Sequence, residues 1–590
     1  MNTISRQPQL PEDIDPITFE VVRSSLDALV DEMAITVMRT AYSGIVKDSM
    51  DYSTVFCDEK GRVIAQGLTI VAHLNSFPDA VNCILEKYKD NIFPGDIFIL
   101  NDPYGSGGIH LPDIFIIKPV FVDQVLEGFS GATAHHSDVG GLVPGSNSTD
   151  STEIYQEGLR IPALKLYEKG IPCEDLFDLI STNVRVPKKV IGDLRAEIAA
   201  VNLGERQYIG LAQKYGITKL RSCIEALIVY TEHLVRSEIS ALKNGRFDFT
   251  AYIDADNIEE GPVIVNLTLT VSGEKMIVDL HGSSPQVKAG INSPLTFTKS
   301  AVYRAVRMVM DPTIPNTSGY HHLIKVKAPP SSVVAGSHPA ACGARGITGF
   351  RVSDAVMGAL AQAAPDRVPA DGDGGHTIIS IGGYDSERIP FTYVDLIGGA
   401  RGAHSNGDGP EGVPYPGGNI SNTPVEIAEV ELPIRIEEYS MLQDTGGPGE
   451  YRGSLSQTRR VRCLVEEAVL QIRSDKRRFR PYGLHGGHQG ASSMNILNPG
   501  SDEAILPTMS VGEMVKDSVV LHKMASGGGW GNPLDRDPGM VRQDVWDEKV
   551  SFLHARETYG VIIDPITYVI DDDGTQALRL SYLKDDKGIT

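Results

Sequence analysis

The sequence predicts an α+β protein of several domains, with a mixed α/β N-terminal part that carries a metal site and a β-rich, glycine-rich C-terminal part. At 590 residues the chain exceeds what one hydrophobic core normally organises. Apolar residues recur at three- and four-residue steps in several segments and alternate in others. Turn residues and glycines become dense in the last third. We place the domains at 1–244, 245–370 and 371–590.

Composition and charge limit the classes of partner. An apolar fraction of 41% is ordinary for a globular protein. The net charge of −22 disfavours binding to nucleic acid or to an anionic membrane, because no basic excess is available to neutralise phosphates. The six cysteines have no CxxC spacing and are expected to be reduced thiols. No secretory leader and no apolar run long enough to span a bilayer is recognisable, so we expect a cytoplasmic protein.

Periodicity and turn signals locate the main elements. Helices are predicted at 15–42, 77–88, 188–215, 218–243 and near 350–363. Strands are predicted at 52–58, 62–66, 97–100, 114–122, 126–134, 263–271 and 276–282. The first dozen residues are expected to form a loose arm. The glycine clusters at 371–375, 444–449 and 526–529 are interpreted as tight turns within a β-rich region.

Histidines, acids and glycines are concentrated between residues 101 and 141. His110 and Asp113 precede the strand at 114–122, and His135 follows the strand at 126–134. Because the two ends of a hairpin lie side by side, we expect Asp113 and His135 to be neighbours. Two imidazoles and one carboxylate suit Mn²⁺, Zn²⁺ or Fe²⁺, and three protein ligands leave a coordination position open, as in catalytic sites. Either histidine can instead be a hydrogen-bonded core residue.

Three further residues complete the predicted site. Asp51 is a possible fourth metal ligand or a general base, and its structural alternative is a turn-capping aspartate. His136 and Asp138 are candidates to orient a ligand imidazole. Asp102 is interpreted as a possible cap of the turn at Pro103. We group Asp51, His136 and Asp138 as catalytic candidates.

Several catalytic signatures are absent from the sequence. It contains no HExxH zincin motif, no GxSxG nucleophile elbow and no Gly-Lys dipeptide, which excludes a Walker A loop. The late glycine clusters lack the strand–turn–helix setting of a dinucleotide-binding motif. If the reaction uses ATP, a P-loop of this chain does not bind it.

Taken together, short strings along most of the chain resemble the hydantoinase B/oxoprolinase family. The matching strings are Met38-Arg39-Thr40-Ala41, Asp51-Tyr52-Ser53, Pro94-Gly95-Asp96, Asn101-Asp102-Pro103-Tyr104, His110-Leu111-Pro112-Asp113, Ala134-His135-His136-Ser137-Asp138-Val139-Gly140-Gly141, Gly192-Asp193-Leu194, Gly418-Asn419, Asp444-Thr445-Gly446-Gly447, Tyr451-Arg452-Gly453, Pro481-Tyr482-Gly483-Leu484 and Gly527-Gly528-Gly529-Trp530-Gly531. The family string before Asp51 usually carries Glu-Arg, where this chain has Asp48-Ser49. Because of this departure, a role of these two positions in contacting substrate or forming a salt bridge is in doubt.

The resemblance implies a complex, cofactors and a reaction class. Family members work with a hydantoinase A-type partner that has an ATPase fold and phosphorylates the substrate. ATP and Mg²⁺ are therefore expected mainly on the partner, in an α2β2 hetero-oligomer. In carboxylase-type relatives the metal is held at the positions of His110, Asp113 and His135. The known reactions are ATP-dependent opening of cyclic amides (hydantoins, 5-oxoproline, caprolactam) and ATP-dependent carboxylation of ketones.

Three functions are consistent with these expectations. We favour the metal-containing subunit of an ATP-dependent cyclic amide hydrolase, since carboxylase-type chains are generally longer than this one. The alternative is a subunit of an ATP-dependent ketone carboxylase of the acetone or acetophenone type. A third possibility is a non-catalytic scaffold for the ATPase partner, with a structural metal.

Overall fold

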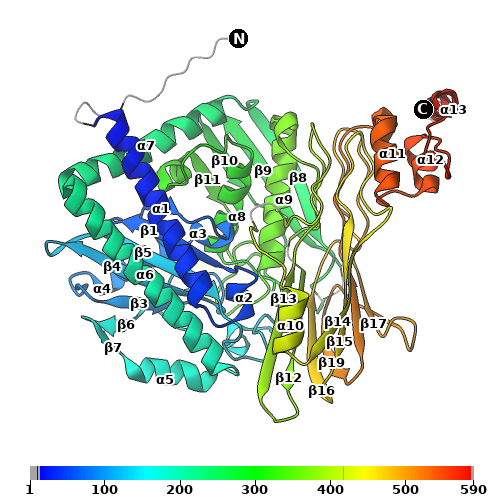
Figure 1. Ribbon diagram of the computed structural model, residues 1–590. Helices are drawn as coiled ribbons and strands as arrows, with labels where there is room; N and C mark the ends of the chain where they lie inside the picture. The colour runs from blue at the N-terminus through cyan, green and yellow to red at the C-terminus, as the bar shows by residue number, and fades with distance from the viewer. Residues whose placement is uncertain are drawn as a thin grey trace.

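The computed structural model describes residue 10 and residues 14–585, except 257, 260, 376, 416 and 417. The described part is a mixed α+β structure with several sheets, most of whose strand pairs are antiparallel, and with helices packed against them (Figure 1). This agrees with the predicted fold class. The arm expected in the first dozen residues lies outside the described residues, apart from residue 10.

The N-terminal part is built on a seven-stranded antiparallel sheet with the strand order β2-β1-β5-β4-β3-β6-β7. Its strands are β1 (Tyr52–Asp58), β2 (Val63–Gln66), β3 (Ile97–Leu100), β4 (Asp113–Val122), β5 (Val125–His135), β6 (Leu164–Glu168) and β7 (Ile171–Pro172). Its helices are α1 (Pro16–Thr40), α2 (Gly44–Lys47), α3 (Val71–Leu74), α4 (Phe77–Tyr88), α5 (Glu174–Asn183), α6 (Pro187–Tyr215) and α7 (Ile217–Ser240).

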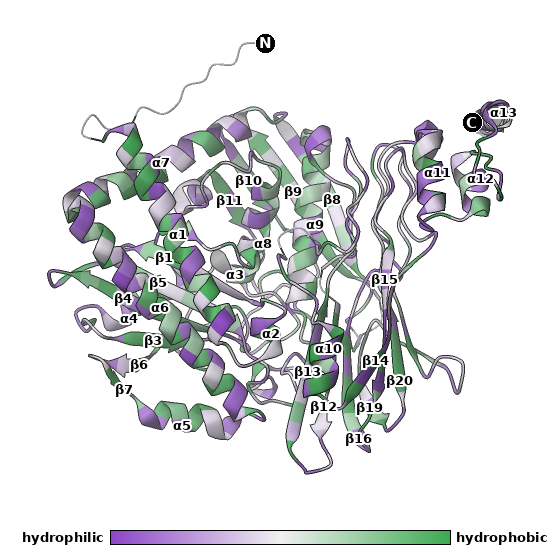
Figure 2. Cartoon of the chain, in the orientation of Figure 1, coloured by the Kyte–Doolittle hydropathy of each residue, from purple (hydrophilic) through white to green (hydrophobic). Residues whose placement is uncertain are grey.

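Helix α1 begins where its sequence predicts. The Asp15 carboxylate accepts a hydrogen bond from the backbone N–H of Thr18 at 2.8 Å, and Pro16 occupies the first turn, where no N–H is needed. Its apolar stripe is buried, as at Leu26 and Met33. Helices α1 and α6 pack on each other and on the sheet, and both carry apolar and polar faces (Figure 2).

The hairpin of β4 and β5 confirms the predicted neighbours. Its strands join through Asp123 and Gln124, whose φ values of 49° and 68° are those of a type I′ turn, which matches strand twist. The register pairs Asp113 with His135. The hairpin therefore brings an acid and an imidazole together at the end opposite its turn.

The middle part combines a four-stranded sheet with two helices. The sheet order is β11-β10-β9-β8, and α9 packs on β8 and β9, with α8 against α9. The elements are β8 (Gly245–Ile253), β9 (Val263–Ser272), β10 (Lys275–Asp279), α8 (Leu295–Met308), β11 (Ile324–Lys327) and α9 (Gly346–Ala363). Helix α9 is buried along nearly its whole length, which makes it a central support.

Two further sheets and four helices form most of the C-terminal part. The sheet orders are β13-β12-β16-β19 and β14-β15-β20-β17-β18. The strands are β12 (Thr377–Tyr384), β13 (Pro390–Ile397), β14 (Ile434–Leu442), β15 (Ser456–Cys463), β16 (Glu467–Arg473), β17 (Met494–Leu497), β18 (Ala504–Leu506), β19 (Met509–Val515) and β20 (Val519–Lys523). The helices are α10 (Val425–Glu431), α11 (Pro538–Trp546), α12 (Phe552–Tyr559) and α13 (Asp572–Asp585). The β-rich expectation thus does not extend to the final helices.

The interpretation of the late glycine clusters as tight turns is wrong for most of their length, since only the start of 444–449 lies in a turn, at Gln443 and Asp444. Segments 370–373, 400–403, 445–454, 481–490 and 526–531 lie side by side and exchange backbone hydrogen bonds, with a turn at 484–487 inside one of them. We call this assembly the glycine array. In 526–531, successive backbone groups bond to different neighbouring segments instead of to one partner strand. The array lies between the C-terminal sheets and the helices α11 and α12 (Figure 1).

Close packing explains why the array needs glycine. The N–H of Gly528 donates to Asp371 and its carbonyl accepts from Ala403, whereas the N–H of Gly527 donates to Ser454. A Cβ on Gly528 would lie 2.7 Å from the carbonyl carbon of Tyr482. Backbone segments pack this closely only where a side chain is absent, which glycine allows.

Buried apolar residues form separate clusters along the chain. One cluster is drawn mainly from residues 14–228, a second mainly from 235–368, a third from 379–524 and a fourth from 541–563. The predicted cuts near 245 and 370 remain our proposal for the domain boundaries. Within the described residues, no helix is both long enough and apolar enough to cross a bilayer.

Candidate metal centre

His110, Asp113 and His135 are buried together at the end of the β4–β5 hairpin. Each offers one ligand atom, and these atoms all lie within 4.8 Å of one another. The Nε2 of His110, the Oδ1 of Asp113 and the Nδ1 of His135 have no hydrogen-bond partner, although all are buried. Unsatisfied buried polar atoms are costly, and a cation bound by all three would remove that cost. The trio therefore fits a divalent metal.

The orientation of His110 strengthens this interpretation. Its Nδ1 lies 3.0 Å from the carbonyl oxygen of Gly343, which only accepts, so Nδ1 carries the proton. The unprotonated Nε2 then faces the Oδ1 of Asp113 at 3.0 Å. Two lone pairs at that distance repel unless a cation or a proton lies between them. A carbonyl that fixes the tautomer of a ligand histidine is a common feature of metal sites.

Asp51 lies beside the trio at the start of β1. Its backbone carbonyl accepts from the N–H of His135 at 2.9 Å, and its Oδ1 is buried without a partner. The preceding Met50 has a φ of 57°, an uncommon conformation for a residue with a side chain, where the chain turns sharply from α2 into β1. This turn presents the Asp51 carboxylate to the site.

His73 belongs to the same site and was not predicted. Ser53 donates its hydroxyl to the carbonyl of Ile70 and so accepts from the Nδ1 of His73 at 3.1 Å. The Nε2 of His73 is thereby left unprotonated, 3.7 Å from Asp51 and 3.6 Å from Asp113. Its sequence setting offered no signal, because a lone histidine in an apolar segment is usually a core residue.

The environment keeps the imidazoles neutral, which is the form that binds metals. Burial lowers the pKa of His73 and of His110 to about 4 and that of His135 well below its usual value. Burial also raises the pKa of Asp51 to about 8, with the charge of Asp113 adding to the effect. Burial would raise the pKa of Asp113 as well, but the positive charge of the ion-paired Arg345 holds it well below its usual value.

His136 and Asp138 bond to other groups. His136 lies 3.1 Å from the buried Glu197 of α6, on the face of the chain opposite to that of its neighbour His135. Asp138 accepts from the backbone N–H groups of Gly140 and Gly145 and pairs with Arg185 at 2.8 Å. These contacts anchor the loop after β5 and make both residues structural supports of the hairpin end. A catalytic role for either remains only a prediction.

Two other sequence expectations concern turns. The Asp102 carboxylate accepts from the N–H of Tyr104 at 3.0 Å, which confirms that it caps the turn at Pro103. Ser49, at one of the two positions that depart from the family string, is buried and bonds to Thr423 at 3.0 Å. That contact joins the N-terminal part to the loop before α10.

The loop that carries Gly343 is fixed by a buried acid. The Oε1 of Glu157 accepts from the backbone N–H groups of Cys342 and Gly343 at 2.8 and 2.6 Å. Burial nevertheless raises the pKa of Glu157 to about 8. The Glu157 carboxyl group, which is mostly uncharged at neutral pH, thus fixes the loop whose Gly343 carbonyl orients His110.

Glu157→Gln is expected to flatten the pH dependence of stability. Because the folded-state pKa is raised, the stability contributed by this group is complete below about pH 4.5 and is lost as pH rises through 8. The loss approaches about 1.4 kcal/mol per pH unit within that window. Glutamine keeps the oxygen that both amides use and does not ionise. Urea unfolding at pH 6 and pH 8 measures the difference, and equal pH slopes for both proteins would contradict the assignment.

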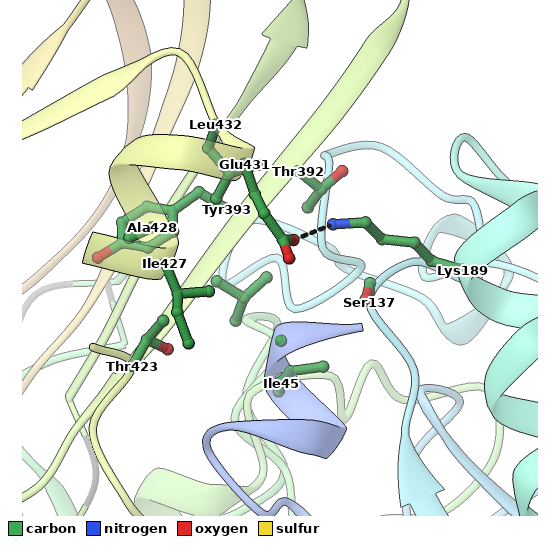
Figure 3. Close-up of a pocket in the computed structure, with 12 residues that line it drawn as sticks. Ile45, Ser137, Lys189, Thr392, Tyr393, Thr423, Ile427, Ala428, Glu431 and Leu432 are labelled. Atoms are coloured by element: carbon green, nitrogen blue, oxygen red, sulfur yellow. Dashed lines mark hydrogen bonds and ion pairs between the residues drawn. The ribbon is translucent and has the colours of Figure 1, made fainter. Parts of the chain in front are cut away.

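A small cavity of about 30 Å³ lies near the hairpin end, between the N-terminal and C-terminal parts. It is lined by Ile45 of α2, by Ser137 and by residues of β13 and α10. Lys189 of α6 and Glu431 of α10 form an ion pair at 3.2 Å across it (Figure 3). A cavity of this volume can hold a water molecule. The N-terminal and C-terminal parts are therefore not tightly packed against each other at this point beside the site.

The whole-chain comparison agrees with this geometry. The model of the family described as Hydantoinase B/oxoprolinase matches residues 15–533. The chain belongs to this family. The match includes every residue of the hairpin site and the whole of the glycine array.

The chain is also similar to proteins that match nearly its whole length. The caprolactamase subunit beta of Pseudomonas jessenii is 32% identical over 594 residues, covering 96% of this chain and 100% of the relative. The crystal structure of the ATP-dependent caprolactamase from Pseudomonas jessenii matches with a TM-score of 0.89 at 29% identity, over 96% of this chain and 100% of that chain. A nucleotide-free acetone carboxylase structure also gives a TM-score of 0.89, over 98% of this chain and 84% of that chain, but at 19% identity it shows a shared fold alone.

Proposed function

We propose that this chain is the metal-containing subunit of an ATP-dependent hydrolase that opens cyclic amides such as hydantoins, 5-oxoproline or lactams. The observation that carries the proposal is the buried trio of His110, Asp113 and His135, with one unsatisfied ligand atom on each residue. Family membership and the likeness to a caprolactamase beta subunit support the cyclic amide as substrate.

Different residues of the site would have different roles in amide hydrolysis. A divalent metal bound by the trio would polarise a carbonyl or make bound water a nucleophile near neutral pH. The neutral imidazoles supply lone pairs, and Arg345 keeps Asp113 ionised. The unpartnered Oδ1 of Asp51 is the group placed to accept a proton from attacking water. Burial of the trio limits competing access by bulk water.

A partner subunit supplies the activation. Unstrained amides are poor electrophiles, and phosphorylation of the carbonyl oxygen makes the carbon a better acceptor for water. We assign that step to a hydantoinase A-type ATPase in an α2β2 complex, because this chain has no P-loop sequence of its own. A ketone carboxylase subunit is the alternative, and the shared fold of acetone carboxylase is compatible with both.

Substrate turnover separates the two functions. The purified chain with its partner is assayed with ATP on lactams, hydantoins, 5-oxoproline and acetone, with and without bicarbonate. We expect ring opening that requires ATP and not bicarbonate. Turnover of the ketone only, and only with bicarbonate, would identify a carboxylase. Partner ATPase activity with no conversion of any substrate would favour the scaffold.

Asp51→Asn distinguishes a base from a ligand. The group of ligand atoms within 4.8 Å comprises His110, Asp113 and His135, without Asp51. We therefore expect the variant to keep its metal content while turnover falls by about 10²–10⁴-fold, the range typical of general acid–base catalysis. Metal analysis and steady-state kinetics on the same preparation test this. Loss of metal from the variant would make Asp51 a fourth ligand.

A further inference from the structure

We propose that Arg473 and Arg345, together with the start of helix α9, form a binding site for a phosphoryl group beside the metal trio. The inference rests on the proposed function, because it assigns this chain the phosphorylated amide as its substrate. The site would hold the phosphoryl oxygens of that substrate through guanidinium groups of this chain, next to the ligand atoms of the trio.

Arg473 is the less compensated of the two arginines. It ends strand β16 and is only 6% exposed. Its Nη1 lies 3.5 Å from the Oδ1 of Asn147, at the limit of a hydrogen bond, and its Nε has no partner. Within the described residues no carboxylate lies within ion-pair distance of this guanidinium. A buried arginine without a counter-ion is costly, and an anionic ligand would remove that cost.

Contacts connect Arg473 to the trio. The amide of Asn147 bonds on one side to the Nε2 of His135 at 3.1 Å and faces Arg473 with its oxygen on the other. The segment after β16 is fixed by Lys476, which pairs with Asp354 at 3.2 Å and with Asp371. The backbone that carries Arg473 is therefore held in place before any ligand arrives, which favours binding.

Arg345 and helix α9 supply the second half of the site. Arg345 is the N-cap of α9 and pairs with the Oδ2 of Asp113, while its Nε has no partner. No side chain caps the start of this 18-residue helix. Gly346, its first residue, is close to Arg473, since a Cβ there would lie 3.8 Å from the Nη2 of Arg473. A helix N-terminus flanked by arginines is a favourable environment for phosphate oxygens.

The net charge near the trio is positive enough to be balanced by a dianion. A divalent ion and two guanidinium groups bring four positive charges, and Asp51 and Asp113 bring at most two negative ones. Glu157 also influences Arg345, but burial raises its pKa to about 8 and its Oε1 is engaged by backbone amides. At least two positive charges remain, which matches a phosphoryl dianion better than a neutral lactam.

Phosphate binding tests the site directly. The chain in complex with its partner, loaded with Zn²⁺ or Mn²⁺, is titrated calorimetrically with inorganic phosphate, methylphosphonate and acetate, without nucleotide. We expect saturable binding of both phosphorus oxyanions and at least a tenfold loss of affinity in Arg473→Gln, with unchanged metal content. Arg473→Lys should restore part of the affinity. Arg388→Gln, which removes an arginine that stacks on Tyr384, is the matched control and should bind as the parent does.

Three results would overturn the proposal: no saturable binding by the parent protein, unchanged affinity in Arg473→Gln, or acetate binding as tightly as phosphate. Phosphate binding to the parent complex that is lost in Arg473→Gln would support the phosphoryl site even if the complex hydrolysed none of the amides. The phosphoryl site and the proposed function can therefore fail independently. In an active complex, Arg473→Gln is also expected to raise the ATP consumed per ring opened, because the phosphorylated substrate is lost before hydrolysis.

Discussion

His110→Ala is expected to remove the bound metal and to abolish turnover of the complex. The variant loses one of three protein ligands, and the Oδ1 of Asp113 and the Nδ1 of His135 remain unsatisfied. Loss of groups that merely support a ligand already weakens metal binding about 10–100-fold, so loss of the ligand itself should exceed about 100-fold. Metal content after dialysis and the ATP-dependent rate of ring opening measure the two effects.

His281→Ala is the matched control for this experiment. His281 is an exposed histidine that pairs with Asp279 at 2.6 Å, away from the trio, and its replacement should leave metal content and rate unchanged. Circular dichroism of both variants verifies folding. Full metal content or full activity in His110→Ala would eliminate the trio as the metal centre under either proposed reaction.

Gly528→Ala is expected to destabilise the fold strongly. Its Cβ would overlap the backbone of Tyr482, lying 2.7 Å from the carbonyl carbon, and backbone cannot move aside as a flexible side chain can. Overpacking of this kind costs about 3 kcal/mol or more, enough to lower yield and the temperature of unfolding markedly. Differential scanning calorimetry measures the effect.

Gly512→Ala is the corresponding control. Gly512 lies in β19, and a Cβ there meets nothing within 4 Å, so the methyl group should be neutral or stabilise by up to about 1 kcal/mol. Equal unfolding temperatures for the parent and Gly528→Ala would show that the array is loosely packed and would refute our account of its glycines.

The parts of the structure that depend on local signals were predictable from the sequence. The buried apolar runs of β4 and β5 and the turn between them predict the hairpin. Its register, which shifts by one residue between Val120 and Phe121, makes Asp113 a neighbour of His135. The long amphipathic helices α1, α6 and α7 follow their apolar periodicity in the same way. The metal trio was therefore accessible from the sequence, because its members lie within or directly beside one hairpin.

The rest depends on packing between distant segments. Arg345 and Arg473 reach the trio from the middle and C-terminal parts, and their sequence surroundings carry no sign of that meeting. His73 acquires its role from Ser53, whose hydroxyl sets the imidazole tautomer. The glycine array was not predictable because glycine-rich strings usually mark turns, whereas most of these strings belong to chains packed against many neighbours.

The glycine array also bears on how stability varies with temperature. Heat capacity rises when unfolding exposes apolar surface and falls when it exposes polar backbone. Apolar sheets and helices thus give the chain a strongly curved stability profile, with weaker cohesion in the cold. The array is held by backbone hydrogen bonds between glycine-rich segments and has little apolar surface to expose. Its own contribution to the curvature is small or of opposite sign, so cooling should loosen the apolar cores of this protein before it loosens the array.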